Sequence, residues 1–234
     1  LALTDTSLTT LNVTGDQAFI FNTADAQTKL ATIDASALTA GATISAAATT
    51  TATNAALTIT GSATEANTLT GSSNADTIVG GANTDTIKGG AGADALTGGA
   101  GNDTFVYGAA AESTLINLDV ITDFQANTKG KGADGAVTDA GAAGFADRDG
   151  DVIDLSAFVA GPITNKIDVS VQANSSDAQT FLQNLGDATT DTLGVALDSS
   201  TGRLFVDVNS DGTVDSIIQL TGVTTIDEAA FAIS

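Results

Sequence analysis

A nine-residue pattern of polar and apolar positions repeats four times without interruption between Gly71 and Val106. Each unit begins with glycine and other turn-forming residues, carries an aspartate at its sixth position and has a large apolar residue at its eighth. The apolar positions are Ile78, Ile87, Leu96 and Phe105. The pattern predicts a six-residue turn followed by a three-residue strand whose apolar side chain fills a narrow interior. A flexible glycine-rich linker has no reason to keep an apolar residue in phase with an aspartate.

The phase of the repeat also stacks its aspartates. Two units make one coil, so every second unit lies directly above its predecessor, at the strand spacing of roughly 4.8 Å. Asp76 then lies over Asp94 along one edge, and Asp85 over Asp103 along the other. Like charges repel at this spacing, so each column needs a cation. Ca²⁺ suits it, because this hard ion takes six to eight oxygens from carboxylates and backbone carbonyls.

Glycine at positions one, two and four of the units lets the backbone adopt positive φ and aim carbonyl groups inward. The turn residues predicted to supply such ligands are Gly80, Ala82, Gly89, Gly90, Gly92, Gly99 and Gly101. Asn74 and Asn83 replace the fourth-position glycine, and asparagine tolerates the left-handed region. A weaker unit precedes the run, with Asn67 at the aspartate position and Leu69 at the apolar one. We therefore expect Asn67 to extend the metal-binding series.

Short β-prone segments recur before the repeats, at Leu8–Thr14, Leu30–Ser36 and Ala55–Gly61. The first two share a pattern in which Leu11 and Ile33 correspond, a step of 22 residues. This recurrence predicts one solenoid coil per repeat. The alternative is a low-complexity, partly disordered Ala/Thr stretch.

Residues 107–234 differ in character, and seven of the nine phenylalanines lie from Phe105 onward, so the larger core is expected there. Ser175–Gly186 predicts a short helix with Ser176 as its cap, Gly186 as its stop, and Phe181, Leu182 and Leu185 on its apolar face. The predicted strands are Leu118–Phe124, Asp151–Phe158 and an antiparallel set, Leu193–Asp198, Arg203–Val208 and Ser216–Gly222. Between the first two lies an insertion, Gln125–Gly150, of a length typical of functional or disordered loops.

These elements predict an all-β fold, a parallel β-roll or β-solenoid followed by a β-rich C-terminal cap with a short helix. Three parts are expected: an Ala/Thr-rich β-solenoid over residues 1–70, a calcium-binding β-roll over 71–107, and the C-terminal part over 108–234.

Two further acidic clusters are candidate metal sites. One matches the first half of an EF-hand loop and comprises Asp207, Asn209, Asp211, Gly212 and Asp215. Its twelfth position is Ile218 instead of a bidentate glutamate, and the same residues between strands also predict a plain hairpin turn.

The second cluster comprises Asp147, Asp149 and Asp151, beside a predicted strand start. It is compatible with an isolated ion site or with a solvated loop. Paired carboxylates also occur in glycoside hydrolases, but no aromatic-rich substrate groove accompanies them here.

The amino-acid composition excludes several classes of function. The 234 residues include 28 acidic and 7 basic side chains, a net charge of −21, which excludes nucleic acid or an anionic membrane as an electrostatic partner. The absence of cysteine and histidine excludes thiol chemistry, histidine-dependent triads and histidine-ligated zinc. No apolar run is long enough for membrane insertion. Without methionine or a visible signal peptide, the chain is expected to be a piece of a larger protein, and this piece does not look like an enzyme.

The segment Gly71–Val106 resembles the β-roll of the RTX family. The members of this family are calcium-binding proteins exported by type I secretion systems of Gram-negative bacteria. The segments Leu118–Phe124, Asp151–Phe158 and Arg203–Val223 resemble the C-terminal part of serralysin-like secretion modules, from which the long insertion departs. The tail, with Asp227 and Glu228 before Phe231 and Ile233, resembles the acidic-then-apolar end of such secretion signals. Residues 1–70 resemble RTX-type bacterial S-layer proteins.

The resemblance implies a calcium-folded, non-catalytic C-terminal region of a secreted S-layer-like protein at the surface of a Gram-negative bacterium. Its implied partners are calcium, the type I secretion machinery, and either further copies of the protein or a cell-surface glycan. Two alternatives stay open: the secretion domain of an exported protease or lipase, and the end of an RTX adhesin. Upstream sequence discriminates them, because a protease would show H-E-x-x-H, a lipase G-x-S-x-G, and an adhesin large repeated extender domains.

Overall fold

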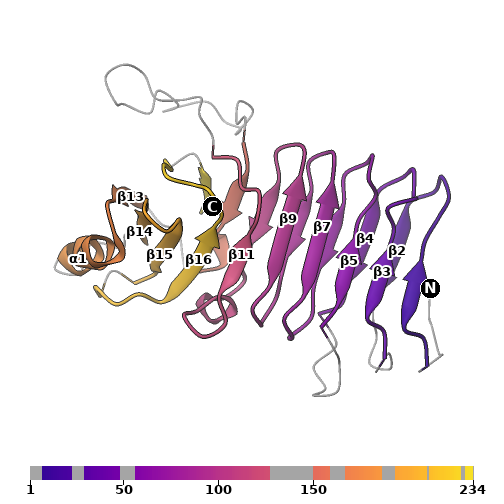
Figure 1. Ribbon diagram of the computed structural model, residues 1–234, viewed down its shortest axis with the longest axis horizontal. Helices are drawn as coiled ribbons and strands as arrows, with labels where there is room; N and C mark the ends of the chain where they lie inside the picture. The colour runs from indigo at the N-terminus through magenta and orange to yellow at the C-terminus, as the bar shows by residue number, and fades with distance from the viewer. Residues whose placement is uncertain are drawn as a thin grey trace.

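The computed structural model describes residues 7–22, 29–47, 56–126, 150–158, 167–185, 193–209, 211–227 and 230–233. From β1 to β12 the chain winds into a flattened parallel coil, with successive strands placed alternately in two facing sheets (Figure 1). This arrangement confirms the predicted all-β fold, a parallel β-roll with one short α-helix among the described residues.

The larger sheet contains, in spatial order, β1 (Thr10–Asn12), β3 (Thr32–Asp34), β5 (Thr58–Thr60), β7 (Thr77–Gly81), β9 (Ala95–Gly99), β11 (Asp119–Ile121), β16 (Ser216–Leu220), β15 (Arg203–Asp207), β14 (Leu193–Asp198) and β13 (Ile167–Gln172). The smaller sheet contains β17 (Phe231–Ala232), β12 (Val152–Asp154), β10 (Thr104–Val106), β8 (Thr86–Lys88), β6 (Thr68–Thr70), β4 (Ala42–Ser45) and β2 (Phe19–Asn22). Every pairing from β1 to β12 is parallel.

The N-terminal segments form coils of the same roll. Leu11 pairs with Ile33, which confirms the predicted 22-residue coil. Ile33 then pairs with Ile59, and Ile59 with Ile78, so the irregular early coils lead into the nine-residue repeats without a break in the sheet. The position of each of these strands is therefore set by its one inward aliphatic residue, and only the length of the turns between the strands varies.

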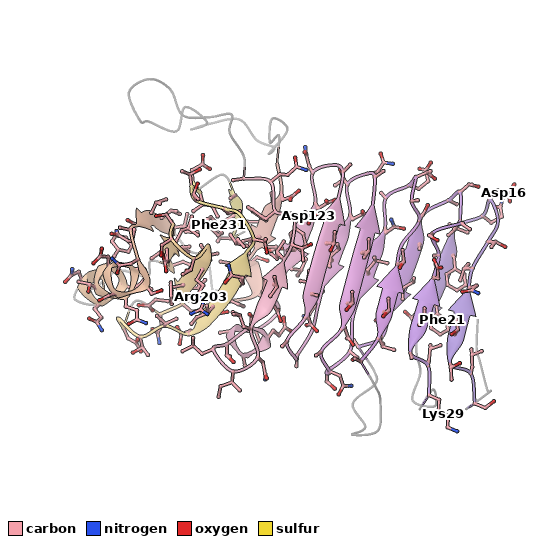
Figure 2. The ribbon with its side chains drawn as sticks, in the orientation of Figure 1. Asp16, Phe21, Lys29, Asp123, Arg203 and Phe231 are labelled. Atoms are coloured by element: carbon pink, nitrogen blue, oxygen red, sulfur yellow. The ribbon has the colours of Figure 1, made fainter. Side chains whose placement is uncertain are left out.

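One apolar core runs through the roll. The eighth-position residues Ile78, Ile87, Leu96 and Phe105 are at most 1 % exposed, as predicted. The same cluster includes Phe21 near one end and Phe231 far along the long axis, both labelled in Figure 2. Because each coil buries its apolar residue only against its neighbours, the roll depends on stacking for its stability.

The C-terminal part extends the larger sheet. β11 pairs in parallel with β16, and β16, β15 and β14 are antiparallel as predicted. Helix α1 (Ser175–Leu185) lies at the end of the molecule away from the N-terminus (Figure 1). Its buried Ala178 and Leu182 form a second small core with Phe205 and Ile217.

Three details differ from the sequence-based expectation. The helix cap is Asn174, whose Oδ1 accepts the amide hydrogens of Ser176 and Asp177, so the prediction of Ser176 was wrong. The segment 151–158 is a short strand followed by a 3₁₀-helix, η2 (Ser156–Phe158), because the Asp154 carboxylate accepts the Ser156 amide and turns the chain. The strand predicted over 118–124 is limited to β11, and another 3₁₀-helix, η1 (Ala110–Glu112), precedes it.

Most of the insertion predicted over Gln125–Gly150 lies outside the described residues, together with Asp147 and Asp149. The helices of the described part are all too short and too polar to cross a lipid bilayer.

Two columns of buried aspartates as a candidate metal centre

The first column follows the larger sheet, at the point where each turn becomes a strand. The amide of Asp76 donates to Oδ1 of Asp94 at 2.7 Å, and the amide of Asp94 donates to Oδ1 of Asp119 at 2.9 Å. At the other end, the Leu57 amide donates to Oδ1 of Asp76 at 2.8 Å. Each aspartate thus binds the backbone of the coil before it, and the predicted stacking of Asp76 with Asp94 is present.

The second column follows the smaller sheet by the same rule. Oδ1 of Asp85 accepts the Asn67 amide at 2.7 Å, and Oδ1 of Asp103 accepts the Asp85 amide at 2.8 Å. Oδ1 of Asp151 accepts the Asp103 amide at 2.9 Å. Asp85 therefore stacks on Asp103 as predicted, and the column continues to Asp151.

These aspartates are almost completely removed from solvent. All six are at most 2 % exposed: Asp76, Asp85, Asp94, Asp103, Asp119 and Asp151. Within the described chain, none is paired with a lysine or arginine; the one ion pair found there joins Lys88 to Glu112 at 2.9 Å. Burying a carboxylate without a counter-charge costs free energy, so we expect the aspartates of the columns to be protonated or to bind a cation.

The pKa values of these aspartates reflect the free-energy cost of burying an ionised carboxylate. Burial raises the pKa of Asp94 to about 7 and that of Asp119 to about 8. The charge of Asp76 adds to the increase at Asp94, and the charge of Asp94 adds to that at Asp119. Burial likewise raises the pKa of Asp85 and of Asp151 to about 6. The pKa values of Asp76 and Asp103 are raised as well, again by burial. In the absence of metal, the folded state therefore favours protonated carboxyl groups.

The second oxygen of most column carboxylates lacks a partner. Among the described residues, no hydrogen-bond donor reaches the buried Oδ2 of Asp85, Asp94, Asp103 or Asp119. The Tyr107 hydroxyl, which is buried and unpartnered as well, lies beside the Asp119 carboxyl group and lowers its pKa. In contrast, Oδ2 of Asp76 accepts the Ser72 amide at 2.5 Å, and Oδ2 of Asp151 accepts the Gln125 amide at 2.8 Å. Unsatisfied buried oxygens of this kind are rare in native proteins, and a bound ion is one explanation for them.

The repeat glycines leave space beside these oxygens. The glycine at position one of each unit lies against the carboxylate of that same unit, and a Cβ atom would collide with Oδ2; these residues are Gly71, Gly80, Gly89 and Gly98. Positive φ occurs at positions two and four, at Gly90, Gly92, Gly99 and Gly101. The prediction of positive φ at position one was wrong, because there the glycine is required for space and not for backbone conformation.

The site fits calcium. Its available ligands are carboxylate and carbonyl oxygens, the donors that this hard ion prefers. In the described part of the chain, no three side chains among His, Cys, Asp and Glu converge on one point. A cation between two stacked aspartates would draw on further oxygens, and backbone carbonyls of the turns that contain Gly80, Ala82, Gly89 and the other predicted turn residues are the expected source.

Asn67 ends the second column by hydrogen bonding. Its Oδ1 accepts the amides of Ala42 and Ser62 at 3.1 and 2.8 Å. Its Nδ2 donates to the carbonyls of Ser62 and Glu65 and to Oδ1 of Asp85. With both amide atoms occupied, this geometry favours a neutral cap over the metal-ligand role predicted for Asn67.

The cluster around Asp207 is organised as a turn between β15 and β16. Oδ2 of the buried Asp207 accepts the Gly212 amide at 2.8 Å, and Oδ2 of Asp215 accepts the Val208 amide at 2.8 Å. Oδ1 of Asp211 accepts the Thr213 amide at 2.7 Å, and Oδ2 of Asp211 accepts a bond from the side chain of Asn209. This network is that of the hairpin alternative, and calcium binding here stays a prediction.

Of the predicted cluster of Asp147, Asp149 and Asp151, only Asp151 falls within the described residues, and it belongs to the second column. Asp119 was not predicted from the sequence. Its signal was the spacing Asp-x-apolar, since Asp119 precedes Ile121 just as Asp94 precedes Leu96. Asp123 was missed too: its carboxylate accepts the amides of Gly98 and Gly99 at the edge of the roll (Figure 2).

Comparison with known families agrees with this geometry. Residues 70–105 match the family model described as RTX calcium-binding nonapeptide repeat, in four copies. The chain therefore contains a calcium-binding β-roll module of the kind found in secreted proteins, and this repeat is a structural motif that is generally non-catalytic. No curated protein matches the chain.

Proposed function

We propose that this chain is the calcium-dependent folding and secretion module of an exported, S-layer-like protein of a Gram-negative bacterium. The observation that carries the proposal is the pair of aspartate columns, buried and without basic partners inside the described roll. A chain with such columns folds poorly when calcium is scarce and folds well when calcium is abundant. Calcium thereby determines in which compartment the protein folds.

The switch follows from ordinary binding linkage. A ligand that binds only the folded state stabilises it by about 2.7 kcal/mol per site at a hundredfold excess over Kd. Several sites in one roll add to this stabilisation. In the cytosol, where calcium is low, the ionised carboxylates favour the unfolded chain, which a type I secretion channel can export. Outside the cell, millimolar calcium fills the columns.

The residues assigned to calcium are Asp76, Asp85, Asp94 and Asp103, with carbonyl ligands from the intervening turns. In this proposal, the three parts have distinct tasks: residues 1–70 continue the solenoid toward a larger surface structure, residues 71–107 bind calcium, and residues 108–234 cap the roll and carry the secretion signal. In support, the tail strand β17 pairs with β12, so the proposed signal is part of the roll once folding is complete.

The S-layer context is favoured over a protease or lipase by the N-terminal coils. β1, β3 and β5 stack in the same sheet as the repeats, and their inward residues enter the same core. A solenoid of this kind extends by adding coils, as a surface-lattice protein requires, and its folded copies would associate with one another or with a cell-surface glycan. Sequencing the gene upstream tests this context: further Thr/Ala coils support it, and a catalytic motif contradicts it.

Circular dichroism tests the folding switch. Spectra and thermal unfolding curves are compared in EGTA and in millimolar calcium at neutral pH. We expect calcium to produce the β-rich spectrum and to raise Tm, and magnesium at equal concentration serves as the control for ionic strength. A fold and a Tm that chelation leaves unchanged contradict the proposal.

A further inference from the structure

The two aspartate columns do not end with the nine-residue repeats. Asp119 stands in line with Asp94 because β11 pairs with β9 in the register Val120 to Ala95. Asp151 stands in line with Asp103 because β12 pairs with β10 in the register Val152 to Thr104. Both added aspartates lie beyond the residues that match the repeat family, 70–105.

We propose that calcium also binds at this junction, between Asp94 and Asp119 and between Asp103 and Asp151. The inference rests on the calcium-binding role proposed above and deepens it. It assigns two sites outside the repeats, each made by one repeat aspartate and one aspartate of the C-terminal part.

The steps across the junction are geometrically equivalent to the steps within the repeats. Within the repeats, an aspartate amide donates to Oδ1 of the next aspartate in the column at 2.7 and 2.8 Å. Across the junction, the same bond is 2.9 Å in both columns. The polypeptide between the paired residues is longer there, yet the backbone and the carboxylates meet in the same way. A cation that fits one step of a column therefore finds the same pair of carboxylates at the next.

Several buried carboxylate oxygens at the junction are unsatisfied. Asp119 is fully buried, and neither its Oδ2 nor that of Asp94 accepts a hydrogen bond from the described residues. The Tyr107 hydroxyl lies beside the Asp119 carboxyl group and lowers its pKa, but it too is without a partner. On the other column, Oδ2 of Asp103 is equally unpartnered. No lysine or arginine of the described residues is paired with any of these groups. A divalent cation compensates two facing carboxylates and occupies the free oxygens, which a hydrogen bond from the protein does not do here.

The position of these sites has a structural consequence. Asp119 begins β11, and β11 is the strand that joins the roll to β16 and the antiparallel C-terminal strands. Asp151 immediately precedes β12, which joins the roll to the tail strand β17. Calcium at the junction therefore attaches the C-terminal part to the roll in both sheets, so that the two parts fold together.

Native mass spectrometry with Ca²⁺ as the only added metal counts the ions. The variants are Asp119→Asn and Asp151→Asn, with Asp154→Asn as the matched control, since Asp154 lies on β12 outside the columns and its carboxylate accepts the Ser156 amide. Asparagine is expected to preserve the fold, because Asn67 already occupies a column position with its Oδ1 accepting backbone amides. We expect each junction variant to lose one calcium per chain and the control to lose none.

A second measurement uses the wild-type chain, so that it does not depend on the folding of a variant. Tyr107 is the single tyrosine, and there is no tryptophan. It is buried close to Asp119 and Asp94, whose charges both act on its hydroxyl. Terbium(III) binds calcium sites and emits under tyrosine excitation only when the two are close. We expect sensitised terbium emission that calcium displaces. It should decrease in Asp119→Asn, where only the repeat site of Asp76 and Asp94 still lies near Tyr107, and stay unchanged in Asp151→Asn.

The outcomes separate this inference from the proposed function. If the wild-type chain binds no calcium at all, the proposed function itself fails. If the repeats bind calcium but both junction variants keep the full count, the junction sites are absent and the folding switch of the repeats stands. If Asp119→Asn leaves the sensitised terbium emission unchanged, the site between Asp94 and Asp119 is absent.

Discussion

The amide of Asp94 donates a 2.9 Å hydrogen bond to Oδ1 of Asp119, although 25 residues separate them in the chain. Asp94 belongs to the third nine-residue unit, and Asp119 to the segment that follows the last one. The bond shows that the column is a property of the coil and not of the repeat motif. Every aspartate of the two columns stands two residues before the inward apolar residue of its strand, and Asp119 keeps this spacing outside the repeats.

This pair governs how the calcium-free protein responds to pH. Burial raises the pKa of Asp94 to about 7 and that of Asp119 to about 8, whereas both are near 3.8 in the unfolded chain. Below about pH 4 these two carboxyl groups make their full contribution to the free energy of unfolding, because they are protonated in both the folded and the unfolded chain. As pH rises toward 8, the unfolded chain releases these protons first, and the stabilisation is lost.

We therefore expect the free energy of unfolding in calcium-free buffer to decrease between pH 5 and 8, as measured by urea titration. In saturating calcium the trend should reverse, since metal binding requires the deprotonated carboxylates. Stability that rises with pH without calcium contradicts the assignment of these aspartates as the dominant titrating groups.

The turn glycines set how closely the coils stack. Gly99 has φ +106°, and a Cβ atom there would collide with the carbonyl oxygen of Gly81 in the adjacent coil. Gly222 also has positive φ, at +78°, but open space surrounds it. We expect Gly222→Ala to cost about 1 kcal/mol from backbone conformation alone, and Gly99→Ala to cost clearly more than that.

Thermal unfolding in calcium measures both variants. Gly99→Ala should also weaken calcium binding in an isothermal titration, because the turn must move away from the neighbouring coil, while Gly222→Ala should leave the affinity unchanged. Equal effects of the two substitutions would show that close stacking of the turns is unimportant.

Much of the roll was predictable from periodicity. The register of Leu11 with Ile33 and the burial of Ile87 follow from one aliphatic residue per strand, which is a local signal. The stacking of Asp76 on Asp94 follows from the constant unit length. These predictions needed no knowledge of tertiary packing, because in a solenoid the nearest neighbour in space is set by the length of the coil.

The parts that were missed depend on irregular spacing. Asp119 follows Asp94 by 25 residues and Asp151 follows Asp103 by 48, so the fixed period did not connect them. Asn67 matched the aspartate position, but its hydrogen bonds to Ser62 and Glu65 come from the shape of one particular turn. Likewise, the choice of Asn174 over Ser176 as helix cap depends on where the chain leaves β13.

The inward aliphatic residues should dominate the stability of the roll. Ile87 is fully buried between Leu69 and Phe105 of the neighbouring strands, whereas Ile116 is 91 % exposed. We expect Ile87→Ala to cost about 2–5 kcal/mol, as large-to-small substitutions in cores do. Ile116→Ala, the same chemical change, should stay within about 0.5 kcal/mol of the wild type. Urea unfolding in saturating calcium measures both, and a loss for Ile87→Ala as small as that for Ile116→Ala contradicts the close packing of the interior.

The Asn67 cap offers a test of the charge balance of the second column. Asn67→Asp keeps the size of the side chain but removes the amide that donates to Ser62, Glu65 and Asp85, and adds a carboxylate directly beside Asp85. Without calcium, we expect a loss of about 2 kcal/mol or more, since buried acceptors lose their donor and like charges meet.

Calcium should restore part of the stability of Asn67→Asp, because the substitution creates one more stacked carboxylate pair of the kind that binds the ion. Asn12→Asp adds the same charge at an exposed position of β1 and serves as the control. Chemical unfolding with and without calcium gives the difference for each variant. A calcium-dependent gain that is equal in Asn67→Asp, Asn12→Asp and the wild type would mean that the column is not the place where calcium acts on stability.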